Sequence, residues 1–196
     1  MLPLKKEEKH YTYADYANRG DNVRYELIDG VIYMMAPPSS AHQRISRELL
    51  LQLGHFLRGK PCEVFAAPFS VRLSADAGDD TVVEPDLLVV CDKSKIDKKG
   101  CNGAPDMVIE IVSPSSGRKD RVLKLNKYSR AGVREYWIVD PDSKTISVHT
   151  LENGRYVLSA HTEEDVIPVH TLEGCRIDMK EVFADIEDFE TSEEDV

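Results

Sequence analysis

No apolar run in the sequence approaches the ~20 consecutive residues that a membrane-spanning helix needs. The first ten residues include lysines without a following apolar stretch, so we expect neither a membrane span nor a secretory signal. The four cysteines, at positions 62, 91, 101 and 175, include no Cys-x-x-Cys pair. A zinc knuckle or a disulfide framework is therefore not expected, and reduced thiols in a cytoplasm are the simpler interpretation.

An internal repeat, a linker and a Gly-x-Ser-x-Gly nucleophile elbow are also missing from the 196 residues. The composition, 41% hydrophobic and 31% charged, is ordinary for a globular protein. We therefore expect one domain over residues 1–196 that ends in an acidic tail, about 181–196.

Charge is unevenly distributed along the chain, whose net charge is −10. Residues 181–196 contain eight acids and no Lys or Arg, whereas residues 93–134 contain eleven basic and four acidic residues. A local basic excess can attract phosphate even on an acidic protein. For Lys93, Lys95, Lys98 and Lys99, a solvated loop is the favoured interpretation.

Two apolar segments, 83–90 and 105–113, each place a carboxylate among core-forming residues. These carboxylates are Asp86 and Glu110, and a buried ionised carboxylate without a partner costs several kcal/mol. Mg²⁺ takes oxygen ligands, commonly one or two carboxylates with waters and substrate phosphate. Asp86, Glu110 and the backbone carbonyl of Ile111 are therefore candidate ligands for Mg²⁺ or Mn²⁺.

A helix expected after the second segment carries Asp120, Lys124 and Tyr128 at four-residue spacing. This spacing places the three side chains on one face. Lys124 could orient an attacking water and offset charge that develops in the transition state. The alternative is an Asp–Lys pair on an exposed face, which contributes only a few tenths of a kcal/mol.

The sequence pattern predicts an α/β sandwich around a mixed sheet. We expect helices at 13–18, 41–57 and 118–130, hairpins over 25–35 and 145–158, and a polar turn at 74–80. Strands are expected at 61–73 with a break at Pro68, at 82–90, at 107–112 and at 135–140. In the acidic tail, Val182, Phe183, Ile186 and Phe189 are candidates for docking on the core.

Several motifs resemble those of the Uma-type restriction endonuclease family, a branch of the PD-(D/E)XK nuclease superfamily. They are Tyr-Glu-Leu-Ile-Asp-Gly at 25–30, His-Gln at 42–43, Glu-Pro-Asp at 84–86, the stretch from Pro-Asp at 105–106 to Glu-Ile-Val-Ser-Pro-Ser at 110–115, and Gly-Val-Arg-Glu-Tyr-Trp-Ile-Val-Asp-Pro at 132–141. The resemblance covers about 13–172, which would be the nuclease-like core. It implies a restriction-endonuclease-like fold with extra N-terminal and C-terminal hairpins, and Mg²⁺-dependent cleavage of DNA, with Asp86 and Glu110 as the two motif acids.

The chain departs from the superfamily pattern at one position. The pattern places a lysine two residues after the second acid, where this chain has Val112. The resemblance suggests that Lys124, on the following helix, supplies this lysine from another backbone position. Cleavage therefore depends on whether Lys124 reaches the two acids, since a fold alone does not establish activity.

Other polar residues rank below these three. Glu26 and His42 are candidate accessory residues, as are Asp120 and Tyr128, although an exposed strand residue and a capping histidine would explain the first two. Glu84 and Asp106 are expected to face solvent. Ser113 and Ser115 are expected to cap the next helix, and Tyr136 and Trp137 to lie in the core.

The leading hypothesis is a cytoplasmic, metal-dependent DNA endonuclease with Asp86, Glu110 and Lys124 at its centre. A homo-oligomer is also expected, with a dimer as its form. One alternative is a non-catalytic nucleic-acid-binding protein that keeps the nuclease fold. Another is a purely structural homo-oligomer without nucleic-acid affinity.

Overall fold

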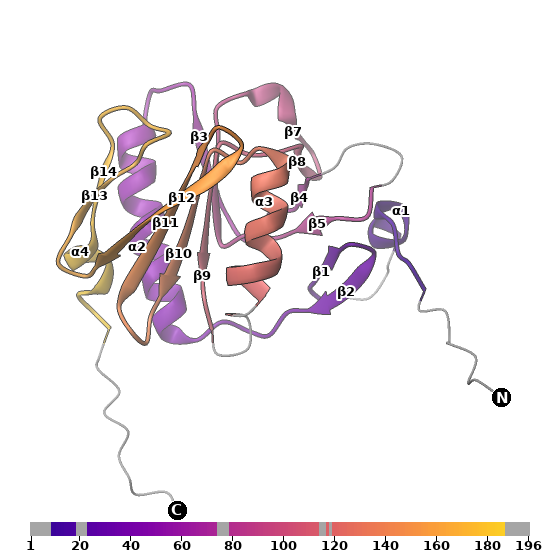
Figure 1. Ribbon diagram of the computed structural model, residues 1–196, viewed down its shortest axis with the longest axis horizontal. Helices are drawn as coiled ribbons and strands as arrows, with labels where there is room; N and C mark the ends of the chain where they lie inside the picture. Colours follow the sequence, from indigo (N-terminus) through magenta and orange to yellow (C-terminus); the bar gives the residue numbers. More distant parts are fainter. Residues whose placement is uncertain (1–8, 19–22, 74–78, 114–116, 118, 187–196) are drawn as a thin grey trace, which may run out of the picture.

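A computed structural model describes residues 9–18, 23–73, 79–113, 117 and 119–186. The two apolar segments that carry Asp86 and Glu110 contribute neighbouring strands to the middle of a six-stranded central sheet (Figure 1). The strand order is β12-β11-β10-β9-β6-β3, and only β9 and β10 run parallel. The strands are β3 (Glu63–Ala66), β6 (Leu87–Val90), β9 (Met107–Ile111), β10 (Glu135–Asp140), β11 (Thr145–Glu152) and β12 (Arg155–Thr162). Every residue of β6 and β9 is buried, as their continuous apolar runs predicted.

A second six-stranded sheet has the order β2-β1-β5-β4-β8-β7. Its strands are β1 (Tyr25–Ile28), β2 (Val31–Met34), β4 (Val71–Arg72), β5 (Val82–Val83), β7 (Ile96–Asp97) and β8 (Gly100–Asn102). The expected hairpin over 25–35 is confirmed as β1 and β2. Its turn residues, Asp29 and Gly30, have φ of 52° and 72°, which Asp-Gly accommodates.

The described residues also form several helices. The helices are α1 (Tyr13–Ala17), α2 (Ser40–Leu57), the 3-10 helix η1 (Lys93–Lys95), the π-helix η2 (Lys119–Lys124), α3 (Leu125–Ala131) and α4 (Met179–Phe183). A small hairpin of β13 (Val166–Pro168) and β14 (Arg176–Asp178) precedes α4. The Ser39 hydroxyl accepts a hydrogen bond from the His42 backbone at the start of α2. At helical spacing along α2, Ile45, Leu49, Leu53 and Leu57 form a buried apolar stripe.

Two apolar cores cover the two faces of the central sheet. Figure 1 shows α2 on one side of this sheet and α3 on the other. One core joins α2, α4 and the β13–β14 hairpin to the face that carries Trp137. The other joins α3 and the second sheet to the face that carries Tyr136. Both aromatic residues are fully buried, as predicted. The architecture is the predicted mixed α+β fold, with helices on both faces of the central sheet.

The strand expected at 82–90 was wrong as a continuous element, because these residues divide into β5 and β6, which belong to different sheets. The break expected at Pro68 is confirmed, since residues 61–73 divide into β3 and β4, which also belong to different sheets. Each break contains a proline, Pro85 or Pro68, which has no N–H to donate to a sheet ladder. Asp86 therefore lies just before β6 rather than within a strand.

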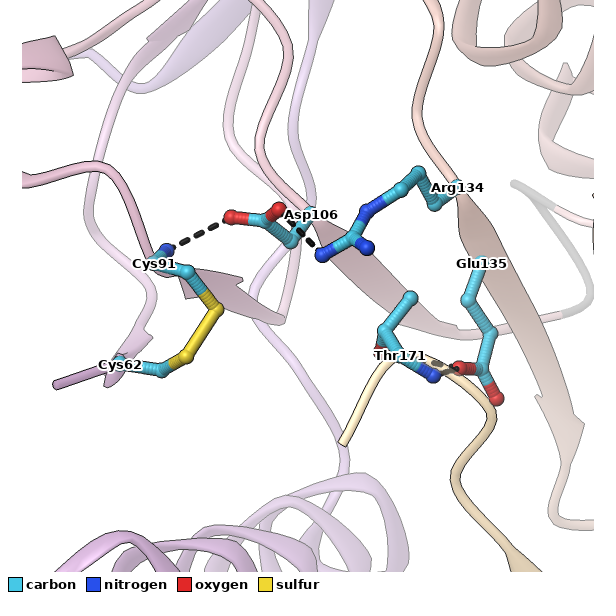
Figure 2. The surroundings of a disulfide bond; sticks show 6 residues. All are labelled: Cys62, Cys91, Asp106, Arg134, Glu135 and Thr171. Carbon is cyan, nitrogen blue, oxygen red and sulfur yellow. Dashed lines mark hydrogen bonds and ion pairs between the residues drawn. A yellow bond between two sulfur atoms is a disulfide. The ribbon is translucent and has the colours of Figure 1, made fainter. Parts of the chain in front are cut away.

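The expectation of four reduced thiols was also wrong, because Cys62 and Cys91 form a disulfide (Figure 2). Cys62 precedes β3 and Cys91 follows β6, and these strands pair Glu63 with Val90. The cysteines are thus the next cross-strand pair, although 29 positions separate them in the sequence. Cys101 and Cys175 are free and buried.

Part of the acidic C-terminal segment docks on the core, as expected. Val182, Phe183 and Ile186 are buried in the same core as α2. Phe189 and Ser115, and most of the expected turn at 74–80, lie outside the described residues. Within the described ranges, no helix combines the length and apolarity needed to cross a membrane.

Candidate active site

The end of the central sheet formed by the start of β6 and the end of β9 brings two acidic side chains together. Because β6 runs antiparallel to β9, Asp86 lies beside the last residues of β9. The backbone N–H of Ile111 donates to Asp86 Oδ2 over 2.7 Å. His42 Nε2, from the first turn of α2, lies 3.1 Å from the same oxygen. His42 thus contacts the candidate metal ligand Asp86. Ile111 contacts Asp86 through its backbone N–H, whereas the group expected to bind a metal is its carbonyl.

Lys124 lies among three carboxylates in the interior. Its Nζ is 2.8 Å from Glu110 Oε1, 2.7 Å from Glu26 Oε1 and 3.4 Å from Asp120 Oδ1. Its side chain is only 3% exposed, so these are buried ion pairs rather than an exposed pair on a helix surface. Lys124 therefore reaches Glu110 although residue 112 is valine.

Glu110 has a second partner on α3. Tyr128 OH donates to Glu110 Oε1 over 2.8 Å, so both contacts fall on the same carboxylate oxygen. Tyr136 OH, on β10, donates to the backbone carbonyl of Asp120 over 3.1 Å. This bond ties the π-helix η2 to the central sheet. Asp120 and Tyr128 thus belong to the same buried cluster as Lys124, as their four-residue spacing predicted.

Glu26, on β1, links the second sheet to this cluster. It is completely buried, accepts the Glu84 backbone N–H at 3.1 Å and lies 2.7 Å from Lys119 Nζ. An exposed strand position is therefore excluded for Glu26. Lys119 is the residue that the sequence did not reveal, because its partner lies 93 positions away.

Glu84 and Asp106 were wrongly expected to face solvent. Glu84 is buried and pairs with Arg24 at 2.9 Å, while Tyr16 OH donates to it over 3.2 Å. Asp106 accepts the Cys91 backbone N–H at 2.6 Å and pairs with Arg134 at 2.6 Å (Figure 2). Glu84 thus borders the acidic cluster, whereas Asp106 lies at the other end of β9.

Burial and neighbouring charges shift the pKa values in opposite directions. Burial raises the pKa of Glu110 well above its usual value, against the attraction of Lys124. Burial also opposes the ionisation of Glu26, but Lys124 and Lys119 lower its pKa overall. Burial alone would lower the pKa of Lys124, yet Glu110, Glu26 and Asp120 hold it well above the usual range. The cluster therefore keeps Lys124 charged and disfavours full ionisation of Glu110.

These residues line a cleft of about 1520 Å³ between the two sheets and the N-terminal part of α2. Asp86, Glu110 and Lys124 all reach its wall. Besides Lys124, the wall includes four other basic residues, namely Arg24, Arg47, Lys119 and Lys144. The cleft thus combines carboxylates with cationic groups that can contact phosphate oxygens.

The donor set fits a hard divalent cation that keeps waters and substrate oxygens as ligands. Within the described ranges, no three His, Cys, Asp or Glu side chains converge as a preformed metal cage. Mg²⁺ needs only one or two carboxylates. Asp120 Oδ1 is buried and, among the described residues, has no hydrogen-bond partner, although the Lys124 ammonium lies 3.4 Å away. A cation beside Glu110 would also favour its ionised form, which burial disfavours.

Comparisons with known proteins agree with this architecture. The family model Uma2, described as "Putative restriction endonuclease", matches residues 10–180, and the chain belongs to this family. The chain is 24% identical over 151 residues to the uncharacterized protein slr1290 of Synechocystis sp. (strain ATCC 27184 / PCC 6803 / Kazusa), covering 76% of this chain and 78% of that protein.

A solved structure shows the same fold. It is the crystal structure of a protein from Anabaena variabilis ATCC 29413 described as a putative nuclease belonging to DUF820. The TM-score is 0.72 at 18% identity, with 88% of this chain and 97% of that chain covered. The restriction-endonuclease-like fold expected from the sequence is thereby confirmed.

Proposed function

We propose that this protein is a metal-dependent endonuclease that hydrolyses phosphodiester bonds in DNA. Asp86 and Glu110 would bind Mg²⁺ or Mn²⁺, with the Ile111 carbonyl as a further candidate ligand. The proposal rests mainly on the contact between Lys124 Nζ and Glu110 Oε1, 2.8 Å long, at the wall of the cleft. This contact supports Lys124 as the replacement for the superfamily lysine, whose usual position is occupied here by Val112.

The metal would polarise a phosphoryl oxygen and lower the pKa of a bound water. Lys124 would hold the attacking water and offset the negative charge that develops on the phosphate. Glu26 and Tyr128 would restrict the positions of Lys124 and Glu110, since each bonds to one of these two side chains. The basic residues among those that line the cleft would position the DNA backbone without reading its sequence.

Plasmid cleavage with Mg²⁺ or Mn²⁺ tests the proposal. Wild-type protein should nick or linearise plasmid, whereas Asp86→Asn, Glu110→Gln and Lys124→Met should each lower the rate about 10²-fold or more, because each removes several kcal/mol of transition-state stabilisation. EDTA should abolish cleavage. An inert wild-type protein, or variants as active as wild type, would refute the proposal.

Glu135→Gln is a matched control, since it changes another fully buried glutamate of the central sheet that does not line the cleft. This variant should cleave at the wild-type rate. Mn²⁺ binding, followed by electron paramagnetic resonance without DNA, separates loss of the metal site from loss of chemistry. Salt-sensitive DNA binding without cleavage would instead favour a non-catalytic binding protein.

A further inference from the structure

The outer strand of the central sheet, β12, has an unprotected edge. β12 pairs with β11 on one side, and no strand of the described chain pairs with its other side. Proteins commonly protect such edges with lysine, proline, inward-pointing charges or a β-bulge. Residues 156–162 contain no Lys, Asp, Glu, Pro or Gly. Val157 and Leu158 are also 51% and 57% exposed, so the edge presents apolar side chains on both faces of the sheet.

The turn before β12 determines which backbone groups point outward. Asn153 and Gly154, with φ of 49° and 77°, form a two-residue turn closed by the pair Glu152 and Arg155. Such a closing pair exchanges backbone hydrogen bonds, and bonded pairs then recur at every second residue. Arg155 and each second residue after it therefore bond to β11. The intervening residues direct N–H and C=O outward, namely Tyr156, Leu158, Ala160 and Thr162.

Thr162 already satisfies its outward groups. Its N–H donates to Asp165 Oδ2 over 2.8 Å, and its C=O accepts the Asp165 N–H over 3.2 Å. A partner strand can therefore pair with a run centred on Leu158, with Tyr156 and Ala160 at its two ends. Such a symmetric run is complementary to a second copy of itself in the antiparallel direction.

Charge favours the same orientation. Arg155 lies at the start of β12, and the acidic turn Glu163-Glu164-Asp165 follows its end. Antiparallel pairing brings Arg155 of each copy beside the acidic turn of the other copy, whereas parallel pairing brings like charges together. The favourable contact occurs twice, because a two-fold axis relates the copies.

We propose that β12 is the interface of a two-fold homodimer, in which it pairs antiparallel with β12 of a second copy and Leu158 lies on the axis. Tyr156 pairs with Ala160 of the second copy, and the three resulting residue pairs form about six backbone hydrogen bonds. Val157 lies opposite Ser159, so both exposed apolar side chains gain cover. The two central sheets join into one, and each copy retains its own cleft.

Size-exclusion chromatography with light scattering, over a range of concentrations without DNA or metal, tests the interface independently of nuclease activity. Wild type should be a dimer, and Leu158→Lys should weaken dimerisation at least 10-fold because it places two lysines at the axis. Leu51→Lys is the matched control, because Leu51 on α2 is equally exposed, at 57%. A wild-type protein that stays monomeric, or a dimer insensitive to Leu158→Lys, would overturn the proposal.

Cysteine cross-linking in the full-length chain tests the register. Leu158→Cys should form an intermolecular disulfide under mild oxidation, because paired residues at the axis have Cα atoms about 5.5 Å apart. Ala160→Cys should not, because the two positions are offset by about 14 Å along the strands. Cross-linking through Ser159→Cys instead of Leu158→Cys would disprove this register, and cross-linking through none of the three would disprove the β12 pairing.

Discussion

The two ends of the central sheet both bury carboxylates, yet they satisfy them differently. At the cleft end, Glu110 contacts Lys124 and Tyr128. At the opposite end, Glu135 accepts the Trp137 indole N–H at 2.7 Å. It also accepts the Thr171 backbone N–H at 2.8 Å, as Figure 2 shows. Glu135 is thus held by neutral donors that do not line the cleft, whereas Glu110 depends on a buried cation.

This contrast shows that burial of a carboxylate alone does not distinguish the two ends of the sheet. The end that carries Glu135, which we call the closed end, also has the Cys62–Cys91 disulfide and the Asp106–Arg134 ion pair (Figure 2). Both join neighbouring segments. The disulfide and the ion pair each join two groups of the protein itself. At the cleft end, three carboxylates share Lys124, and the pKa of Glu110 is raised. In the part of the chain that the structure describes, this end combines an excess of carboxylates around one lysine with the space of a cleft.

Lys124→Met should have the largest effect on stability. Removal of the buried ammonium leaves Glu26 and Glu110 without their shared cation, and breaking a buried ion pair costs about 3–5 kcal/mol. Urea unfolding at pH 7 measures this loss. The double variant Lys124→Met/Glu26→Gln should recover part of it, and no recovery would contradict a charge-based origin.

Loss of the disulfide at the closed end should come next. Cys62→Ser/Cys91→Ser opens a loop with a sequence separation of 29, and the free energy of unfolding should fall by about 2–4 kcal/mol. Urea unfolding with and without reductant provides the measurement, and reductant should leave the double variant unchanged. Cleavage well below the unfolding transition should stay at the wild-type rate. A selective loss of cleavage would show that the two ends are coupled.

Glu135→Gln should destabilise the protein by about 1–3 kcal/mol. In the wild type, donors contact both carboxylate oxygens of Glu135, whereas the glutamine amide has only one acceptor oxygen. Thermal unfolding detects this change. The metal affinity should stay unchanged, in contrast to that of Glu110→Gln. Weakened metal binding in Glu135→Gln would remove the distinction between the two glutamates.

The smallest effect concerns His149, which stacks on Tyr136. Burial, with a contribution from Arg121, lowers the pKa of His149 in the folded state. The unfolded chain therefore binds a proton first on acidification, and stability decreases as the pH falls through about 6.5 towards the folded-state pKa. His149→Gln should flatten this part of the stability profile, measured by urea unfolding between pH 7 and pH 5. An unchanged profile would exclude His149 as its source.

Sequence patterns predicted local elements better than strand partners. The β1–β2 hairpin and the buried stripe of α2 follow from an Asp-Gly turn and from helical spacing, which are local signals. The break at Pro68 was predicted and the break at Pro85 was not, and no local pattern indicated that the strands on either side of each proline belong to different sheets. The cross-strand contact of Cys62 with Cys91 depends on the pairing of β3 with β6, which no local pattern encodes.

By itself, the sequence determined the two acids, the absence of lysine at position 112 and a helix that could carry its replacement. Tertiary structure alone decided that Lys124 points to Glu110, that Glu26 from another sheet shares the same ammonium, and that Lys119 joins them. The physical reason is that helical spacing fixes which residues share a face, whereas the packing of distant segments decides what that face meets.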